Sequence, residues 1–191
     1  MRILQLILLT ACISCMTISC APEQKRIPEK KNSLLESDWK EVLETDLHLL
    51  GHRNWILVVD KAFPEQSSPG MKYIYVEQDL LPTLEHVLDA LDKSTHVKPI
   101  IYQDKELSYI KEEQVNGIEA FRSAAAKTLD GRAVNTLLHD EVFQMLDESS
   151  SLFRVLVIKT NCTLPYTSIF LQLDCSYWGP DNEKILRELM M

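Results

Sequence analysis

The sequence lacks the short motifs that identify many classes of enzyme. It has no GxGxxG and no P-loop, so it indicates neither a dinucleotide nor a nucleotide site. It also has no GxSxG, no HExxH and no pair of CxxC motifs, which leaves a serine hydrolase or a zinc site without support. We therefore predict neither a metal nor a cofactor.

Clusters of positive charge are missing as well. Lys and Arg number 20 against 28 Asp and Glu, giving a formal net charge of −8 that is spread along the chain. A nucleic-acid surface needs clustered Lys and Arg, so nucleic acid is not a predicted partner. No repeat of about 20 to 50 residues is present, which excludes solenoids and propellers. What remains is the composition of an ordinary globular domain, with 46% apolar residues.

The one long apolar run lies at the N-terminus. Arg2 precedes ILQLILLTACISCMTI, which is shorter than the roughly 20 apolar residues of a membrane span and is followed at once by polar residues. This pattern is typical of an export signal rather than of a buried helix. We predict a signal peptide over residues 1–19, a tether over residues 20–35 and a folded domain over residues 36–191.

Two leader cysteines resemble bacterial lipidation sites. TISC ends at Cys20 and LTAC ends at Cys12. Cys20 is favoured because it leaves a leader of the right length and a polar sequel. Cys12 and plain cleavage to a free periplasmic protein are the alternatives. A lipid on Cys20 would hold the protein on a membrane face without a transmembrane helix, so we expect it in the periplasm or cell envelope.

The two other cysteines are predicted not to form a disulfide. Cys162 and Cys175 flank a segment that has the pattern of a strand. Thirteen extended residues reach about 43 Å, whereas a disulfide needs Cα atoms within about 7 Å.

Helical and strand-like segments alternate along the folded part. Helices are predicted near residues 37–50, 80–91, 104–130 and 140–149, and strands at residues 54–60, 72–78, 97–103, 133–139, 152–160 and 166–174. Gly51 is placed to end the first helix in a left-handed conformation. The alternation predicts a single α/β domain whose mostly buried sheet is flanked by helices.

Three polar residues lie where strands meet loops or helices. His52 enters a buried strand, Asp60 ends the same strand, and His139 leaves a later one. Such junctions line the ligand crevices of open α/β sheets. A carboxylate after four aliphatic residues needs a hydrogen-bond partner or a ligand, although capping the next loop would also satisfy Asp60. The other histidines are predicted to be solvated: His48, His86 and His96.

Four segments, in order, resemble the motifs of one family. They are LGHRNWILVVDKAFP, YVEQDLLPTLEHVLDAL, HDEVF and FRVLVIKTNCTLPYTSIFL, and together they cover most of residues 45–178. The chain is similar to the ribose pyranase/fucose mutarotase (RbsD/FucU) family. This resemblance implies a three-layer RbsD-like fold and a homo-oligomer. It also implies a protein that interconverts the ring forms or anomers of a free monosaccharide without metal or nucleotide.

The resemblance assigns roles to five residues. His52 would be the general acid/base, since the imidazole pKa of about 6.5 suits both proton transfers. Asp60 would bind sugar hydroxyls or orient an imidazole. The pocket would be completed by His139, Tyr166 and Ser168. His52 and Asp60 are up to about 26 Å apart if extended, so they share a pocket only if a loop folds back or if two subunits contribute.

The chain departs from the family pattern at three places. Ser168 stands where the closing motif has Asn, Asn161-Cys162 replaces Gly-Glu, and Asn54 replaces an acidic residue. These changes leave open a carbohydrate-binding lipoprotein without catalysis. A third interpretation is a structural envelope protein whose oligomer is its function.

Overall fold

The computed structural model describes residues 31–191, with side chains from Trp39 onward. The predicted signal peptide and the lipidation site at Cys20 lie outside these residues. Within residues 31–191, no helix has both the length and the apolar character that a membrane crossing requires.

Six strands form one mixed sheet in the order β2-β5-β1-β6-β3-β4. β1 and β2 run parallel to β5, β3 runs parallel to β4, and β6 is antiparallel to both β1 and β3. All of β1 and nearly all of β5 are buried, as continuous apolar runs predict for strands covered on both faces. The strands are β1 Trp55–Val59, β2 Met71–Tyr75, β3 Val97–Asp104, β4 Val134–Leu137, β5 Val155–Lys159 and β6 Ile169–Cys175.

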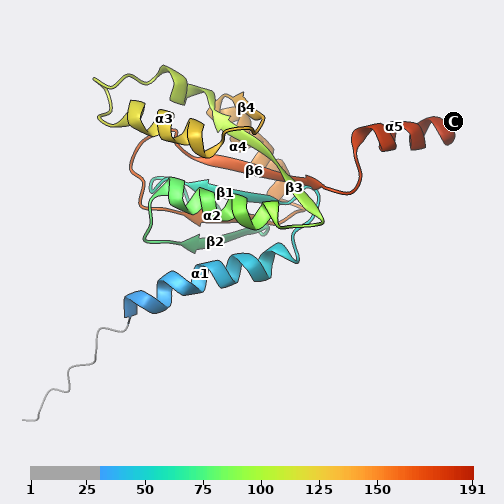
Figure 1. Ribbon diagram of the computed structural model, residues 1–191, viewed down its shortest axis with the longest axis horizontal. Coiled ribbons are helices and arrows are strands. Elements are labelled where there is room, and N and C mark those ends of the chain that lie inside the picture. The colour runs from blue at the N-terminus through green and yellow to red at the C-terminus, as the bar shows by residue number, and fades with distance from the viewer. Residues whose placement is uncertain (1–30) are drawn as a thin grey trace, which may run out of the picture.

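Helices cover both faces of this sheet (Figure 1). α1, α2 and α3 pack with Ile56 and Val58 of β1, whereas α4 packs with Trp55 and Leu57, which point to the opposite face. The predicted single α/β domain with a buried, helix-flanked sheet is confirmed. The helices are α1 Lys31–Leu47, α2 Leu80–Asp92, α3 Ile118–Thr128, α4 His139–Ser150 and α5 Pro180–Leu189, with a 3-10 turn at Lys105–Tyr109.

The end of α1 differs from the sequence-based prediction. α1 ends at Leu47, and Gly51 is not left-handed; the positive φ in this loop, 75°, belongs to Arg53. His96 fixes the helix end instead, because its Nε2 lies 3.1 Å from the carbonyl oxygen of Leu47 and 3.0 Å from that of Leu50. The prediction of a merely solvated His96 was therefore wrong: its ring contacts the carbonyl oxygen of Leu47, the last residue of α1, and that of Leu50 in the turn that follows.

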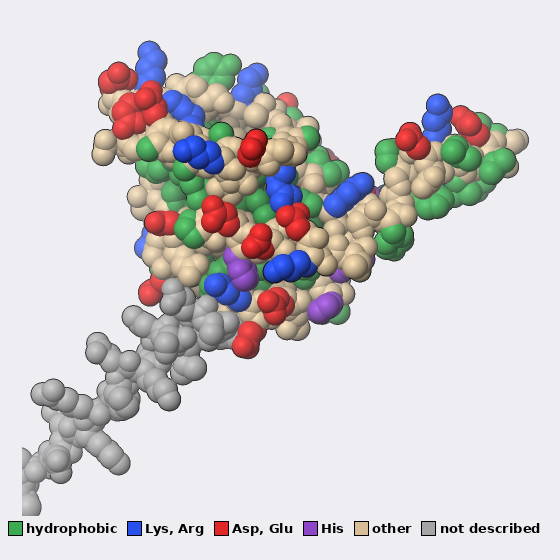
Figure 2. Space-filling model, in the orientation of Figure 1, with side chains coloured by type: hydrophobic (Ala, Val, Ile, Leu, Met, Phe, Trp, Pro, Cys, Tyr) green, Lys and Arg blue, Asp and Glu red, His purple; other side chains and the backbone are tan. Residues whose placement is uncertain are grey.

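The chain leaves the sheet at Cys175 and ends in α5, which the sequence analysis did not predict. Cys162 precedes β6 and Cys175 is its last residue, and both are free cysteines, in line with the separation expected from the strand between them. α5 projects away from the sheet (Figure 1), and none of its residues is buried. The space-filling view shows apolar side chains along it (Figure 2), and Ile185 and Leu189 are exposed.

Candidate active site

Four of the five residues predicted for the site gather at one edge of the sheet, which is formed by the last residues of β1, β3 and β4 and the first residues of β6. β1 and β6 are antiparallel, so Asp60, which follows β1, meets Ser168, which precedes β6. His139 begins α4 directly after β4, and its ring contacts the ring of Tyr166. His52 precedes β1 and therefore lies at the opposite edge. We call the first group, together with Asp104 described below, the candidate site.

Asp60 is held by groups on both of its carboxylate oxygens. The Ala62 N–H donates to Oδ1 at 2.8 Å, so Asp60 does cap the loop after β1. The Ser168 hydroxyl donates to Oδ2 at 2.9 Å and accepts from the Asp60 N–H at 3.2 Å. Ser168 is only 2% exposed. Its hydroxyl is thus committed to Asp60, and Asp60 is the partly exposed member of the pair.

His139 is paired with a buried carboxylate that the sequence analysis did not single out. Nδ1 of His139 lies 3.0 Å from Oδ2 of Asp104, the last residue of β3. Asp104 is 1% exposed, and its Oδ1 has no hydrogen-bond partner among the described residues. Burial raises the pKa of the Asp104 carboxyl from 3.8 to about 6, against the opposing effect of His139, while Glu106 and Asp60 raise it further.

The ring of His139 is fixed by its neighbours on several sides. Phe143, one turn along α4, lies with its ring centroid 4.5 Å away, and Tyr166 meets the imidazole edge-on at 5.3 Å. Glu106 accepts the backbone N–H of His139 with both carboxylate oxygens at 3.1 Å, which secures the start of α4. The His139 side chain is still 37% exposed, so a small molecule can reach it.

Tyr166 has a backbone conformation that bulky residues seldom adopt. Its φ is 57°, in the left-handed region. Such conformations persist where the surrounding structure imposes them, and they concentrate at functional sites. Here the turn places the tyrosine ring, 38% exposed, against His139.

His52 has a carboxylate partner of its own at the far edge. Its Nδ1 lies 3.0 Å from Oδ1 of Asp174, near the end of β6, and its side chain is 56% exposed. Lys98 lies 3.8 Å from the other oxygen of Asp174. β1 lies between the two edges, and five strand residues span about 17 Å. Within one copy of the chain, His52 therefore does not join Asp60 and His139.

Asp104 and Asp174 could be found from sequence to different degrees. Asp104 ends the strand VKPIIYQD, but it follows Tyr102 and Gln103 rather than four aliphatic residues, so the signal that selected Asp60 is weaker there. Asp174 follows IFLQL, in which Gln172 interrupts the apolar run. Its pairing with His52 depends on the antiparallel register of β6 beside β1.

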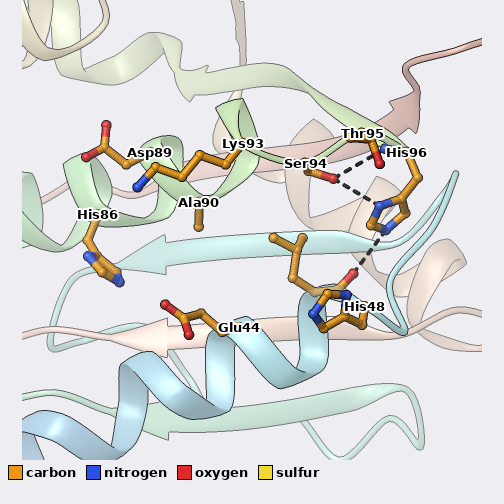
Figure 3. Close-up of a pocket in the computed structure, with 10 residues that line it drawn as sticks. Glu44, His48, His86, Asp89, Ala90, Lys93, Ser94, Thr95 and His96 are labelled. Carbon is orange, nitrogen blue, oxygen red and sulfur yellow. Dashed lines mark hydrogen bonds between the residues drawn. The ribbon is translucent and has the colours of Figure 1, made fainter.

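A separate hollow of about 360 Å³ lies between α1 and α2 and contains three histidines (Figure 3). His96 is engaged with the end of α1, His86 meets the ring of Trp39 edge-on at 5.1 Å, and His48 is exposed. Among residues 31–191, no group of three or more His, Cys, Asp or Glu side chains is placed to hold a metal ion. The position of His96 is thus explained by capping, whereas His86 packs on Trp39 and its buried Nε2 has no hydrogen-bond partner among the described residues.

Most of the chain matches the model of one protein family. Residues 29–175 match the model of the RbsD / FucU transport protein family, which covers the whole sheet and all helices except α5. The chain belongs to this family. Membership of the RbsD/FucU family supports a sugar-related function, and the three-layer α/β fold is the one expected for a member.

Solved structures of RbsD/FucU proteins resemble this member at low sequence identity. One is Bacillus subtilis RbsD complexed with D-ribose, 20% identical over 70% of this chain and 91% of that one, with a TM-score of 0.47. Another is the fucose mutarotase of Streptococcus pneumoniae in complex with L-fucose, 15% identical over 77% of this chain and 98% of that one, also with a TM-score of 0.47. No curated protein matches the sequence.

Proposed function

We propose that this RbsD/FucU family member is a monosaccharide mutarotase or pyranase. One observation carries the proposal: Asp60, His139 and Tyr166, which come from three distant parts of the chain, converge at one sheet edge through contacts with Ser168 and Asp104. They supply a carboxylate for sugar hydroxyls, an imidazole for proton transfer and an aromatic ring for the sugar face.

Ring opening needs a proton removed at one oxygen and a proton added at another. A base takes the proton of the anomeric hydroxyl, the bond between the anomeric carbon and the ring oxygen breaks, and an acid protonates the ring oxygen. The open-chain carbonyl then closes from its other face to give the other anomer, or through another hydroxyl to give the other ring size. Histidine performs both transfers near neutral pH.

His52 is proposed as the general acid/base, supplied to the candidate site by a second copy of the chain. Its exposed ring and its distance from Asp60 in one copy support this arrangement, which makes the protein a homo-oligomer. Because a shared site needs one residue from each copy, His52→Ala and His139→Ala should each be inactive alone. After refolding together in equal amounts, they should regain about a quarter of the wild-type activity. No recovery on mixing would contradict the shared site.

The activity itself is tested by NMR exchange between the anomers and ring forms of ribose and fucose. The wild type should accelerate exchange for at least one of them, and His52→Ala should abolish the acceleration. His48→Ala, at an exposed histidine outside the candidate site, is the matched control and should keep wild-type rates. A folded protein that accelerates no exchange would refute the enzymatic proposal.

A second candidate function is carbohydrate binding without catalysis. The departures of Ser168 and Asn161-Cys162 from the family pattern motivate this second candidate. Calorimetric binding of a sugar whose exchange is not accelerated would select this function.

We also propose that the protein is exported and lipidated at Cys20. The support is the short apolar leader that follows Arg2 and the TISC motif at its end. Mass spectrometry of the mature protein should find a diacylglyceryl-modified Cys20 as its first residue. An N-terminus at Cys12 or at an unmodified residue would correct this assignment.

A further inference from the structure

The strongest unassigned feature of the candidate site is the carboxylate beneath His139. Asp104 is 1% exposed, and its Oδ2 lies 3.0 Å from Nδ1 of His139. Its other oxygen, Oδ1, has no donor among the described residues. A buried charge is costly unless it is paired. In the described part of the chain, His139 is the basic group that pairs with Asp104.

We propose that Asp104 is a positioning residue that keeps the proton of neutral His139 on Nδ1, so that Nε2 is the atom that exchanges protons with the sugar. An ionised carboxylate can only accept a hydrogen bond, so the shared hydrogen must be on the imidazole nitrogen. The remaining nitrogen then has a free lone pair and acts as the base. When Nε2 takes the proton of the anomeric hydroxyl, Asp104 stabilises the resulting imidazolium, while His52 of the second copy gives a proton to the ring oxygen. This inference rests on the proposed function.

The surroundings of the pair reinforce this assignment. The other groups that act on Asp104 are Glu106 in the 3-10 turn and Asp60 after β1, and both are acidic. Tyr166, from the turn before β6, meets the imidazole edge-on, and Phe143 packs beside it within α4. The acidic neighbours and the apolar rings both disfavour a net negative charge on the Asp104–His139 pair. They therefore favour the state in which the pair holds one additional proton. Since burial raises the pKa of Asp104 to about 6, that extra proton should leave near pH 6.

The decisive variant is Asp104→Asn, which keeps the shape and removes the charge. We expect kcat for sugar ring exchange to fall by about 100-fold or more, with little change in KM, because the loss affects proton transfer rather than binding. In the wild type, kcat plotted against pH should fall on the acidic side near pH 6. In Asp104→Asn, this fall should move to lower pH. Asp140→Asn, an exposed residue next to His139, is the matched control and should keep both the rate and the position of this fall.

Imidazole nitrogen NMR provides a readout that does not depend on activity. In the wild type at pH 8, His139 should carry its proton on Nδ1, and its signals are assigned by their disappearance in His139→Gln. In Asp104→Asn, whose side-chain amide can donate as well as accept a hydrogen bond, both tautomers of His139 should be populated. A wild-type proton on Nε2 at pH 8, or an Asp104→Asn variant with unchanged kcat and the wild-type His139 tautomer, would overturn the inference. If the wild type shows the Nδ1 tautomer but accelerates no sugar, the proposed function fails while the Asp104–His139 coupling stands.

Discussion

Asp104→Asn should change how the stability of the protein depends on pH. The folded-state pKa of Asp104, about 6, lies above its ordinary value of 3.8. A carboxyl whose pKa is raised by folding holds its proton more tightly in the native state. Its burial is therefore least costly at low pH, and stability is lost as the pH rises from about 4 to about 6.

The size of this loss follows from the same two values. A rise in pKa from 3.8 to about 6 corresponds to about 3 kcal/mol once the group is ionised in both states, at 1.36 kcal/mol per pKa unit. At pH 4 a small part of that loss has already occurred, so about 2 to 3 kcal/mol is lost between pH 4 and pH 8. Asparagine does not titrate and contributes nothing to this slope.

Chemical denaturation at fixed protein concentration, at pH 4 and at pH 8, measures the effect. The free energy of unfolding of the wild type should fall by about 2 to 3 kcal/mol more than that of Asp104→Asn over this interval. The comparison cancels the titrating groups that are not coupled to Asp104 and any constant cost of the substitution. Asp140→Asn, whose side chain stays in water, should follow the wild type. Parallel pH dependences for Asp104→Asn and the wild type would refute the reasoning.

Three further changes test the packing. Gly70→Ala should lower the free energy of unfolding by about 2 kcal/mol or more, because a Cβ there would lie 2.2 Å from the Phe153 carbonyl oxygen. Gly51→Ala, where a Cβ would meet open space, should lower it by less than about 1 kcal/mol, and equal melting temperatures of the two variants would contradict this. Ser168→Ala should lower the free energy of unfolding by about 1 to 2 kcal/mol by removing the hydrogen bonds to Asp60, and unchanged denaturant midpoints would count against it. Truncation before α5 should shift the melting temperature by less than about 2 °C, because none of its residues is buried; a large drop would show that α5 packs on another copy.

The layers of the fold were predictable because apolar periodicity is local. Runs such as WILVV identified strands buried on both faces, and the stripe of α2 identified a helix. The end of α1 was not predictable from Gly51, because the partner that fixes it, His96, lies about 46 residues away in sequence. α5 was missed although its sequence carries helix signals: Pro180 at its start, acidic residues in its first turn and Arg187 in its last.

The candidate site was predictable only as separate residues. The resemblance to family motifs selected Asp60, His139 and Tyr166, and the fold brings them to one edge. The carboxylates that pair with the two histidines depend on the sheet register. Asp104, the partner of His139, ends β3 beside β4, and Asp174, the partner of His52, is the last residue but one of β6, beside the start of β1. Pairings of this kind depend on strand order, which local sequence patterns do not contain.

Ser168 bears on how tightly a sugar is held rather than on whether its ring opens. Its hydroxyl is 2.9 Å from Asp60 Oδ2 and is buried, so this residue orients Asp60 and forms no direct part of the surface that a sugar meets. Losing one neutral hydrogen bond to a ligand costs about 0.5 to 1.5 kcal/mol, or roughly a two- to tenfold weaker affinity. In the proposed mechanism, proton transfer depends on the imidazoles of His52 and His139, each of which has a carboxylate 3.0 Å from its Nδ1. The departure from the family's Asn therefore weakens the case for tight sugar binding while leaving the acid–base groups in place, so exchange rates at saturating sugar are the measurement that separates an isomerase from a binding protein.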